Sequence, residues 1–206
     1  MHLERFIMKK LVLYFIATLI FTSTGSLLAQ DFDKGLAAYK AGDYATALKE
    51  FKPLAEQGHA RAQASLGGMY AMGLGVPQDT KAAMKLYILV AEQGHARAQS
   101  SLGVIYAVGL GVPKDYKAAV KWFRLAAEQG DATAQFNLGS MYIKGQSVPQ
   151  DNIIAYMWLN LADTNGYKDA SKYRDIVVKI MSQADISKAQ AMSSACFAQD
   201  YNNCGY

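Results

Sequence analysis

Residues 91–115 read AEQGHARAQSSLGVIYAVGLGVPKD, and residues 55–79 carry nearly the same stretch as AEQGHARAQASLGGMYAMGLGVPQD. Between residues 55–90 and residues 91–126, 25 of 36 positions are identical. A third, more divergent copy begins at Ala127. Several residue types recur in strict register: Gly58, Gly94, Gly130 and Gly166; Leu66, Leu102 and Leu138; Tyr70, Tyr106 and Tyr142; Pro77, Pro113 and Pro149. A fixed period of this length is typical of a solenoid, whose stacked units share one continuous core.

Each unit contains the signals for two helices. We expect Gly94 to end one helix as a left-handed cap and His95 to cap the next, over residues 96–107. Glycines and a proline follow, and Asp115 can cap a second helix over residues 116–128. Apolar and small residues recur at helical spacing and predict one buried face on each helix: Ala98, Leu102, Ile105 and Tyr106 on the first; Ala119, Trp122, Phe123 and Ala126 on the second. Lys117, Lys121 and Arg124 are expected to face solvent.

Glycine also occurs inside the first helix of each unit, as Gly67, Gly103 and Gly139. An interior glycine costs about 1 kcal/mol relative to alanine. The missing side chain allows a neighbouring helix to approach more closely than usual, so we expect close helix packing at these positions.

The pattern AxAQxxLGxxYxxGxGVPxDxxxAxxWxxxAAExG, which residues 96–130 fit almost throughout, resembles the Sel-1-like repeat, a relative of the tetratricopeptide repeat. This resemblance implies an all-α fold, an α/α superhelical solenoid of antiparallel helix pairs. It also implies the main role of that family, which is to act as an adaptor or scaffold for protein assemblies.

The chain is expected to divide into four segments. Residues 1–29 form a signal peptide, and residues 30–54 form a tetratricopeptide-like capping helix pair joined at Gly42 and Asp43. Residues 55–166 form three repeats of 36 residues, and residues 167–206 form C-terminal capping helices, divided near Ser182, with a cysteine-containing tail. In the third repeat Ser147 replaces a loop glycine, a departure from the pattern that affects only the local turn geometry.

The signal peptide is predicted from the order of its residues. Lys9 and Lys10 precede an apolar run over residues 11–21, and small and polar residues follow. This run is shorter than the roughly 20 apolar residues that cross a bilayer as a helix. Cleavage after Ala29 is therefore favoured, and retention as an N-terminal anchor is the alternative. The mature protein is expected to be periplasmic or secreted, without an integral membrane span.

Charge gives little support for nucleic-acid or anionic-membrane binding. The chain has 21 basic and 17 acidic residues. Without residues 1–29 the surplus of basic groups falls to 18 against 16, and it forms no basic runs. The expected partner is a protein or peptide.

Only two cysteines occur, Cys196 and Cys204. In an exported protein an even number of cysteines favours a disulfide, and a turn over residues 200–203 allows these two to pair. Two thiols without nearby histidines make a poor zinc site.

No catalytic or cofactor-binding motif occurs in the sequence. His59 and His95 occupy equivalent positions in successive repeats, and Asp131 occupies the same position in the third. Helix capping is therefore favoured over metal binding. We therefore expect no enzyme activity, no metal and no cofactor. The alternative is a hydrolase of the β-lactamase or penicillin-binding type, because some exported, cysteine-rich relatives have been linked to that activity. Those relatives carry a cysteine pair in each repeat, which this chain lacks.

Glutamine recurs at Gln63, Gln99 and Gln135, and it could form a polar ladder for a ligand or bond to the backbone at repeat junctions. The second interpretation is favoured. Trp122 and Trp158 are likewise expected in the core rather than on a binding platform.

If the fixed positions build the core, the positions that vary on the first helix of each repeat are candidates for recognition, and solenoids bind partners on an extended concave surface. The alternative is a face that is merely solvated. The predicted strip comprises Arg61, Ser65, Gly68 and Met72; Arg97, Ser101, Val104 and Val108; Thr133, Asn137, Ser140 and Lys144.

Overall fold

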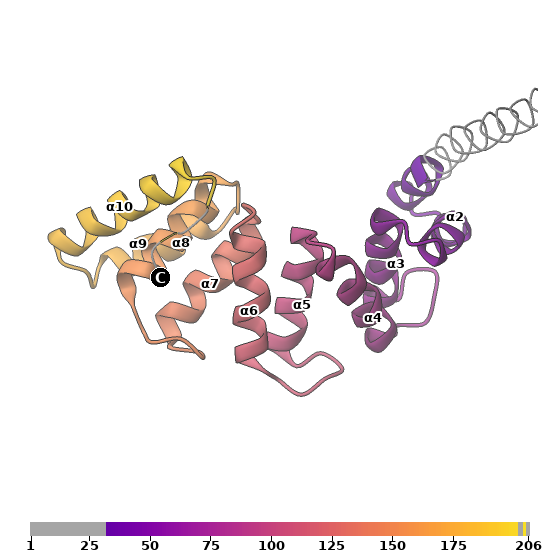
Figure 1. Ribbon diagram of the computed structural model, residues 1–206, viewed down its shortest axis with the longest axis horizontal. Coiled ribbons are helices and arrows are strands. Elements are labelled where there is room, and N and C mark those ends of the chain that lie inside the picture. The colour runs from indigo at the N-terminus through magenta and orange to yellow at the C-terminus, as the bar shows by residue number, and fades with distance from the viewer. Residues whose placement is uncertain (1–31, 202–203, 205–206) are drawn as a thin grey trace, which may run out of the picture. The chain divides into compact units, whose positions relative to one another are not determined.

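The computed structural model describes residues 32–201 and residue 204, so the predicted signal peptide lies outside the described part. The chain divides into two compact units, Met1–Gln78 and Asp79–Tyr206, and each is described here by itself. The described residues form helices and no strand, which confirms the all-α prediction (Figure 1). Within this part, no helix is both long enough and apolar enough to span a bilayer.

The described residues of the N-terminal unit form a helix over residues 32–40, helix α2 (Tyr44–Glu56) and helix α3 (Ala60–Met72). The first two helices are joined by Gly42, at φ +80°, and Asp43, as expected. Asp43 caps α2 because its side chain accepts a hydrogen bond from the Thr46 amide at 3.1 Å. Hydrogen bonds from Thr46 lower the pKa of the Asp43 carboxyl.

Among its described residues, the C-terminal unit contains seven helices (Figure 1). They are α4 (Thr80–Glu92), α5 (Ala96–Val108), α6 (Tyr116–Ala127), α7 (Ala132–Lys144), α8 (Asn152–Thr164), α9 (Ala170–Val178) and α10 (Gln183–Ala198). The repeat helices α4 to α8 each pack against the next along the chain, and α10 packs against α8. The predicted helices over 96–107 and 116–128 match α5 and α6 to within one residue, and Ser182 caps α10.

Glycine and aspartate set the helix boundaries as expected. Gly94 has φ +91° and Gly109 has φ +78°, both in the left-handed region that glycine adopts without strain. Asp115 caps α6 by accepting a hydrogen bond from the Ala118 amide. Ser147 has φ +56°, close to the φ of +69° at Gly111 one repeat earlier, so the third loop keeps the same backbone conformation with a residue that adopts it less readily.

Helices pack closely at the interior glycines of the C-terminal unit. A Cβ atom added to Gly103 would lie 2.4 Å from Cδ1 of Phe123, and one added to Gly139 would lie 2.8 Å from Cγ of Leu159. Phe123 is fully buried, and Trp158 is also fully buried in the same core cluster. The prediction of close approach is therefore confirmed at both glycines.

Two predictions for α6 are wrong in detail. Trp122 is half-buried, and Val120 occupies the core at 7% exposure instead. Arg124, expected in solvent, is half-buried, and its Nη2 atom donates a hydrogen bond to the Tyr142 hydroxyl at 3.0 Å. The long aliphatic stem of arginine allows such partial burial while the guanidinium keeps a polar partner.

Candidate functional site

On α5, the predicted recognition residues form one continuous stripe. Arg97, Ser101, Val104 and Val108 follow each other at spacings of four, three and four residues, which places them on one face of the helix. Val104 is 37% exposed and Val108 is 62% exposed. Two branched apolar side chains therefore lie at the surface, although the opposite side of α5 is buried in the core.

The corresponding stripe on α7 is more polar. Thr133 and Lys144 are exposed, whereas Asn137 and Ser140 are half-buried. The Asn137 Nδ2 atom donates a hydrogen bond to the Thr133 carbonyl at 2.8 Å. Because α5 and α7 contact each other, the two stripes lie on neighbouring helices of one unit. We call these eight residues the α5–α7 strip: Arg97, Ser101, Val104, Val108, Thr133, Asn137, Ser140 and Lys144.

The remaining predicted strip residues lie on α3, in the N-terminal unit. Arg61 and Met72 are exposed, the latter at 57%, and Ser65 is half-buried, as is Gly68. The Arg61 guanidinium lies over the Phe32 ring, 4.3 Å from its centre, and Phe32 also stacks on His59. A cation over an aromatic face is attractive. Arg61 therefore has an intramolecular role in holding the first helix.

Each recurrent glutamine bonds to the backbone where two repeats join, as the favoured interpretation predicts. The Nε2 atoms of Gln63, Gln99 and Gln135 donate to the carbonyls of Ala55, Ala91 and Ala127, each at 3.1 Å. Gln135 is fully buried. These amides join consecutive helices and are not arranged as a ligand ladder.

A second set of side-chain hydrogen bonds, not predicted from the sequence, completes this arrangement. Oε1 of Gln99 accepts a hydrogen bond from Gln129 at 2.8 Å, and Oε1 of Gln135 accepts one from Asn165 at 2.9 Å. Asn165 in turn accepts a hydrogen bond from the Tyr201 hydroxyl at 2.8 Å. Gln129, Asn165 and Tyr201 follow at intervals of 36 residues, so the period itself was the signal that could have revealed them.

The capping interpretation of the histidine positions holds, with one difference. His59 and Asp131 accept hydrogen bonds from the Ala62 and Ala134 amides, at 3.2 and 2.8 Å. His95 occupies the same capping position on α5 but makes no capping bond with its side chain. Among the residues that the structure describes, no group of three or more histidine, cysteine, aspartate or glutamate side chains could hold a metal ion.

The cysteines lie at the end of the C-terminal unit. Cys196 and Cys204 form a disulfide, with their Cα atoms 4.7 Å apart, and both are buried in the core cluster of that unit. The eight-residue link brings Tyr201 back against Gly130, where an added Cβ would lie 2.9 Å from Cε2 of the tyrosine ring. The disulfide thus holds the tail in the position where Tyr201 reaches Asn165.

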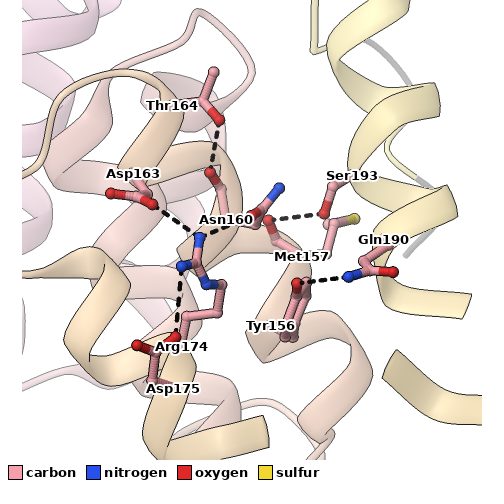
Figure 2. A network of polar contacts seen from close by, with 9 residues as sticks. All are labelled: Tyr156, Met157, Asn160, Asp163, Thr164, Arg174, Asp175, Gln190 and Ser193. Atoms are coloured by element: carbon pink, nitrogen blue, oxygen red, sulfur yellow. Dashed lines mark hydrogen bonds and ion pairs between the residues drawn. The ribbon is translucent and has the colours of Figure 1, made fainter. Parts of the chain in front are cut away.

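A polar network anchors α9 and α10 to α8 (Figure 2). Arg174 donates hydrogen bonds to Asn160 at 3.1 Å and to Asp163 at 2.8 Å, and its other terminal nitrogen lies 3.4 Å from Asp175. On the other side of α8, Ser193 contacts the Met157 carbonyl at 3.5 Å. These contacts satisfy polar groups between helices, which indicates a structural role.

An aromatic cluster stabilises the same end of the unit. Phe136 stacks on Tyr167, with ring centres 4.2 Å apart, and Tyr173 meets Phe136 edge-on at 5.0 Å. Burial raises the pKa of the Tyr167 hydroxyl, and the negative charge of Asp169 adds to this effect.

Comparison with known proteins identifies the repeat. The model of the Sel1 repeat matches residues 60–95, 96–131 and 132–166, which together make up just over half of the chain. No curated protein matches the chain significantly.

Two solved structures are similar to this chain. A Sel1 repeat protein from Oxalobacter formigenes is 27% identical, with a TM-score of 0.68 over 82% of this chain and 77% of that one. A protective antigen present in uropathogenic Escherichia coli strains, which displays an SLR fold, is 26% identical, with a TM-score of 0.53. That match covers 90% of this chain and 49% of the antigen.

Proposed function

Because the chain belongs to the Sel1 repeat family, whose members generally act as scaffolds for protein interactions, we propose that it is a non-enzymatic adaptor that binds a peptide or protein segment on the α5–α7 strip. The observation that carries this proposal is the exposure of Val104 and Val108 one helical turn apart. A partner that covers exposed apolar side chains stabilises the complex by about 25 cal/mol per Å² of apolar surface buried.

The arrangement of contacts supports binding by a preformed surface. Gly103 packs α5 against Phe123 of α6, and Gln135 of α7 bonds to the Ala127 carbonyl of α6, so α6 holds α5 and α7 in place. A surface held by a rigid scaffold loses little conformational entropy when a partner binds.

We infer that the protein works in the periplasm or outside the cell. The N-terminal order of lysines, apolar run and small residues supports export. The Cys196–Cys204 disulfide supports an oxidising compartment. Cell fractionation with mass spectrometry of the N-terminus tests this inference: a mature chain that begins near residue 30 in the envelope or medium is expected, and an intact N-terminus in the cytoplasm contradicts it.

Site-specific photo-crosslinking in the producing cell tests the binding face. A photoreactive phenylalanine analogue at Val104 or Val108 is expected to capture one recurring partner. The same analogue at Lys117, which is exposed on α6, provides the control. If the strip positions capture nothing, or capture the same products as the control position, the proposed binding face is wrong.

A further inference from the structure

The α5–α7 strip carries basic groups and no acidic ones. Arg97 and Lys144 are both exposed, and no aspartate or glutamate occurs anywhere in the 13 residues of α5 or the 13 residues of α7. Asp131, which precedes α7, uses its carboxylate to cap that helix. The strip therefore offers cations to a partner without a competing carboxylate on either helix.

Helix stability does not account for Arg97. It is the second residue of α5, where the positive end of the helix dipole disfavours a cation. No ion pair or aromatic contact engages its guanidinium within the described residues, whereas Arg61, at the same position of α3, covers the Phe32 ring. A negative group on a partner would offset the unfavourable position of Arg97.

The spacing of these features sets the size of the bound segment. Arg97 and Val108 are 11 residues apart on α5, which corresponds to about 16 Å along the helix. Lys144 occupies the register position of Val108 one repeat later, so the two cations lie toward opposite ends of the strip. Because α7 lies about one interhelical distance of 8–10 Å to the side of α5, Arg97 and Lys144 are about 19 Å apart, which an extended chain covers in about six residues. Val104 is exposed between these ends.

We propose, building on the function proposed above, that the α5–α7 strip binds an extended segment of a partner protein with two carboxylates about six residues apart and branched apolar side chains between them. The carboxylates pair with Arg97 and Lys144, and the apolar side chains cover Val104 and Val108. Ser101 and Asn137 contribute less, because each already bonds to a carbonyl of its own helix. Charge thus selects the segment, and apolar contact holds it.

Selection from displayed peptide libraries tests this proposal with the mature chain. One library has aspartate at two positions with five residues between them, drawn from valine, leucine, isoleucine, threonine and serine. Two matched libraries have asparagine or lysine at the same two positions. We expect the aspartate library to give at least about tenfold more binders than the other two, enriched in valine, leucine and isoleucine, with affinities that fall as salt is raised.

Two charge-reversal variants locate the binding. Arg97→Glu with Lys144→Glu is expected to lose at least about tenfold in affinity for the selected acidic peptides and to favour the lysine library instead. Lys85→Glu with Lys117→Glu makes the same change of charge at exposed positions of α4 and α6 and is expected to leave binding unchanged. Circular dichroism confirms that both variants stay helical.

The outcomes separate this inference from the proposed function. One outcome is that the three libraries give equal numbers of binders and that these binders are lost in Val104→Ser with Val108→Ser. This result would overturn the acidic specificity but would still support the strip as the binding face. Equal loss in both charge-reversal variants would overturn the role of Arg97 and Lys144. Absence of binders from all three libraries would overturn this choice of segment, whereas the crosslinking experiment decides independently whether the strip binds a protein.

Discussion

The Tyr201 hydroxyl donates a hydrogen bond to Oδ1 of Asn165, which lies 36 residues earlier in the chain, at 2.8 Å. Asn165 in turn donates a hydrogen bond to Oε1 of Gln135, and Gln135 donates one to the carbonyl of Ala127. The C-terminal tail is thus hydrogen-bonded to the last of the glutamine junctions between repeats. Stability at this end of the protein should therefore depend on the tail.

Removal of the Tyr201 hydroxyl is expected to destabilise the C-terminal unit. Tyr201→Phe keeps the ring against Gly130 but removes the donor to Asn165, which should cost about 0.5–1.5 kcal/mol of unfolding free energy. Urea denaturation followed by tryptophan fluorescence measures this loss, because both tryptophans, Trp122 and Trp158, lie in that unit. Tyr173→Phe, at an exposed position of α9, is the control and should change the free energy by less than about 0.5 kcal/mol.

Loss of the disulfide is expected to lower stability further. Cys196 and Cys204 are eight residues apart, and a link that closes so short a loop contributes about 2–3 kcal/mol by restricting the unfolded chain. Cys196→Ser with Cys204→Ser should lower the melting temperature by about 4–10 °C. A thiol reductant should lower it in the wild type and leave the variant unchanged. Equal melting temperatures for wild type and variant would show that the link contributes nothing.

An added methyl group at Gly103 is expected to destabilise α5 against α6. Alanine would gain about 1 kcal/mol in helix propensity, but its Cβ would lie 2.4 Å from Phe123 Cδ1, and such overpacking costs about 1–3 kcal/mol or more. We therefore expect a net loss of stability in Gly103→Ala by denaturation. In a Phe123→Leu background the penalty should fall, because the smaller side chain leaves room. An equal penalty in both backgrounds would rule out the contact with Phe123 as its cause.

Glycine at residue 147 is expected to stabilise the third loop. Ser147 has φ +56°, a conformation that destabilises a non-glycine residue by about 1–2 kcal/mol. Glycine avoids this strain but loses about 0.5–1 kcal/mol more conformational entropy on folding, because it is freer in the unfolded chain. Ser147→Gly should raise the melting temperature by about 1–4 °C. Gly111→Ser, the reverse change in the preceding loop, should lower it by more, because a Cβ at residue 111 would also lie 2.9 Å from Cβ of Thr80. A lower melting temperature in Ser147→Gly would contradict this explanation.

Much of the fold follows from local signals in the sequence. The ends of α5 and α6, the left-handed glycines and the capping aspartates were predictable, because each depends on residues a few positions apart. The eight predicted strip residues of the C-terminal unit also fall on exposed or half-buried positions of one helical face, although their role in binding stays a prediction. Burial on α6 was less predictable, since Val120 rather than Trp122 turns into the core.

The 36-residue period alone determined the helix pairs, their register and the residues that vary on α5 and α7, because a repeated sequence places equivalent residues at equivalent positions of a stacked array. Only the tertiary structure decided the partners of Gln99 and Gln135, the return of Tyr201 to Asn165 and the partial burial of Arg124. These contacts join side chains 18 to 36 residues apart. Their formation depends on the distance between packed helices. That distance is set where Phe123 lies against Gly103 and Leu159 against Gly139, and no local sequence pattern gives it.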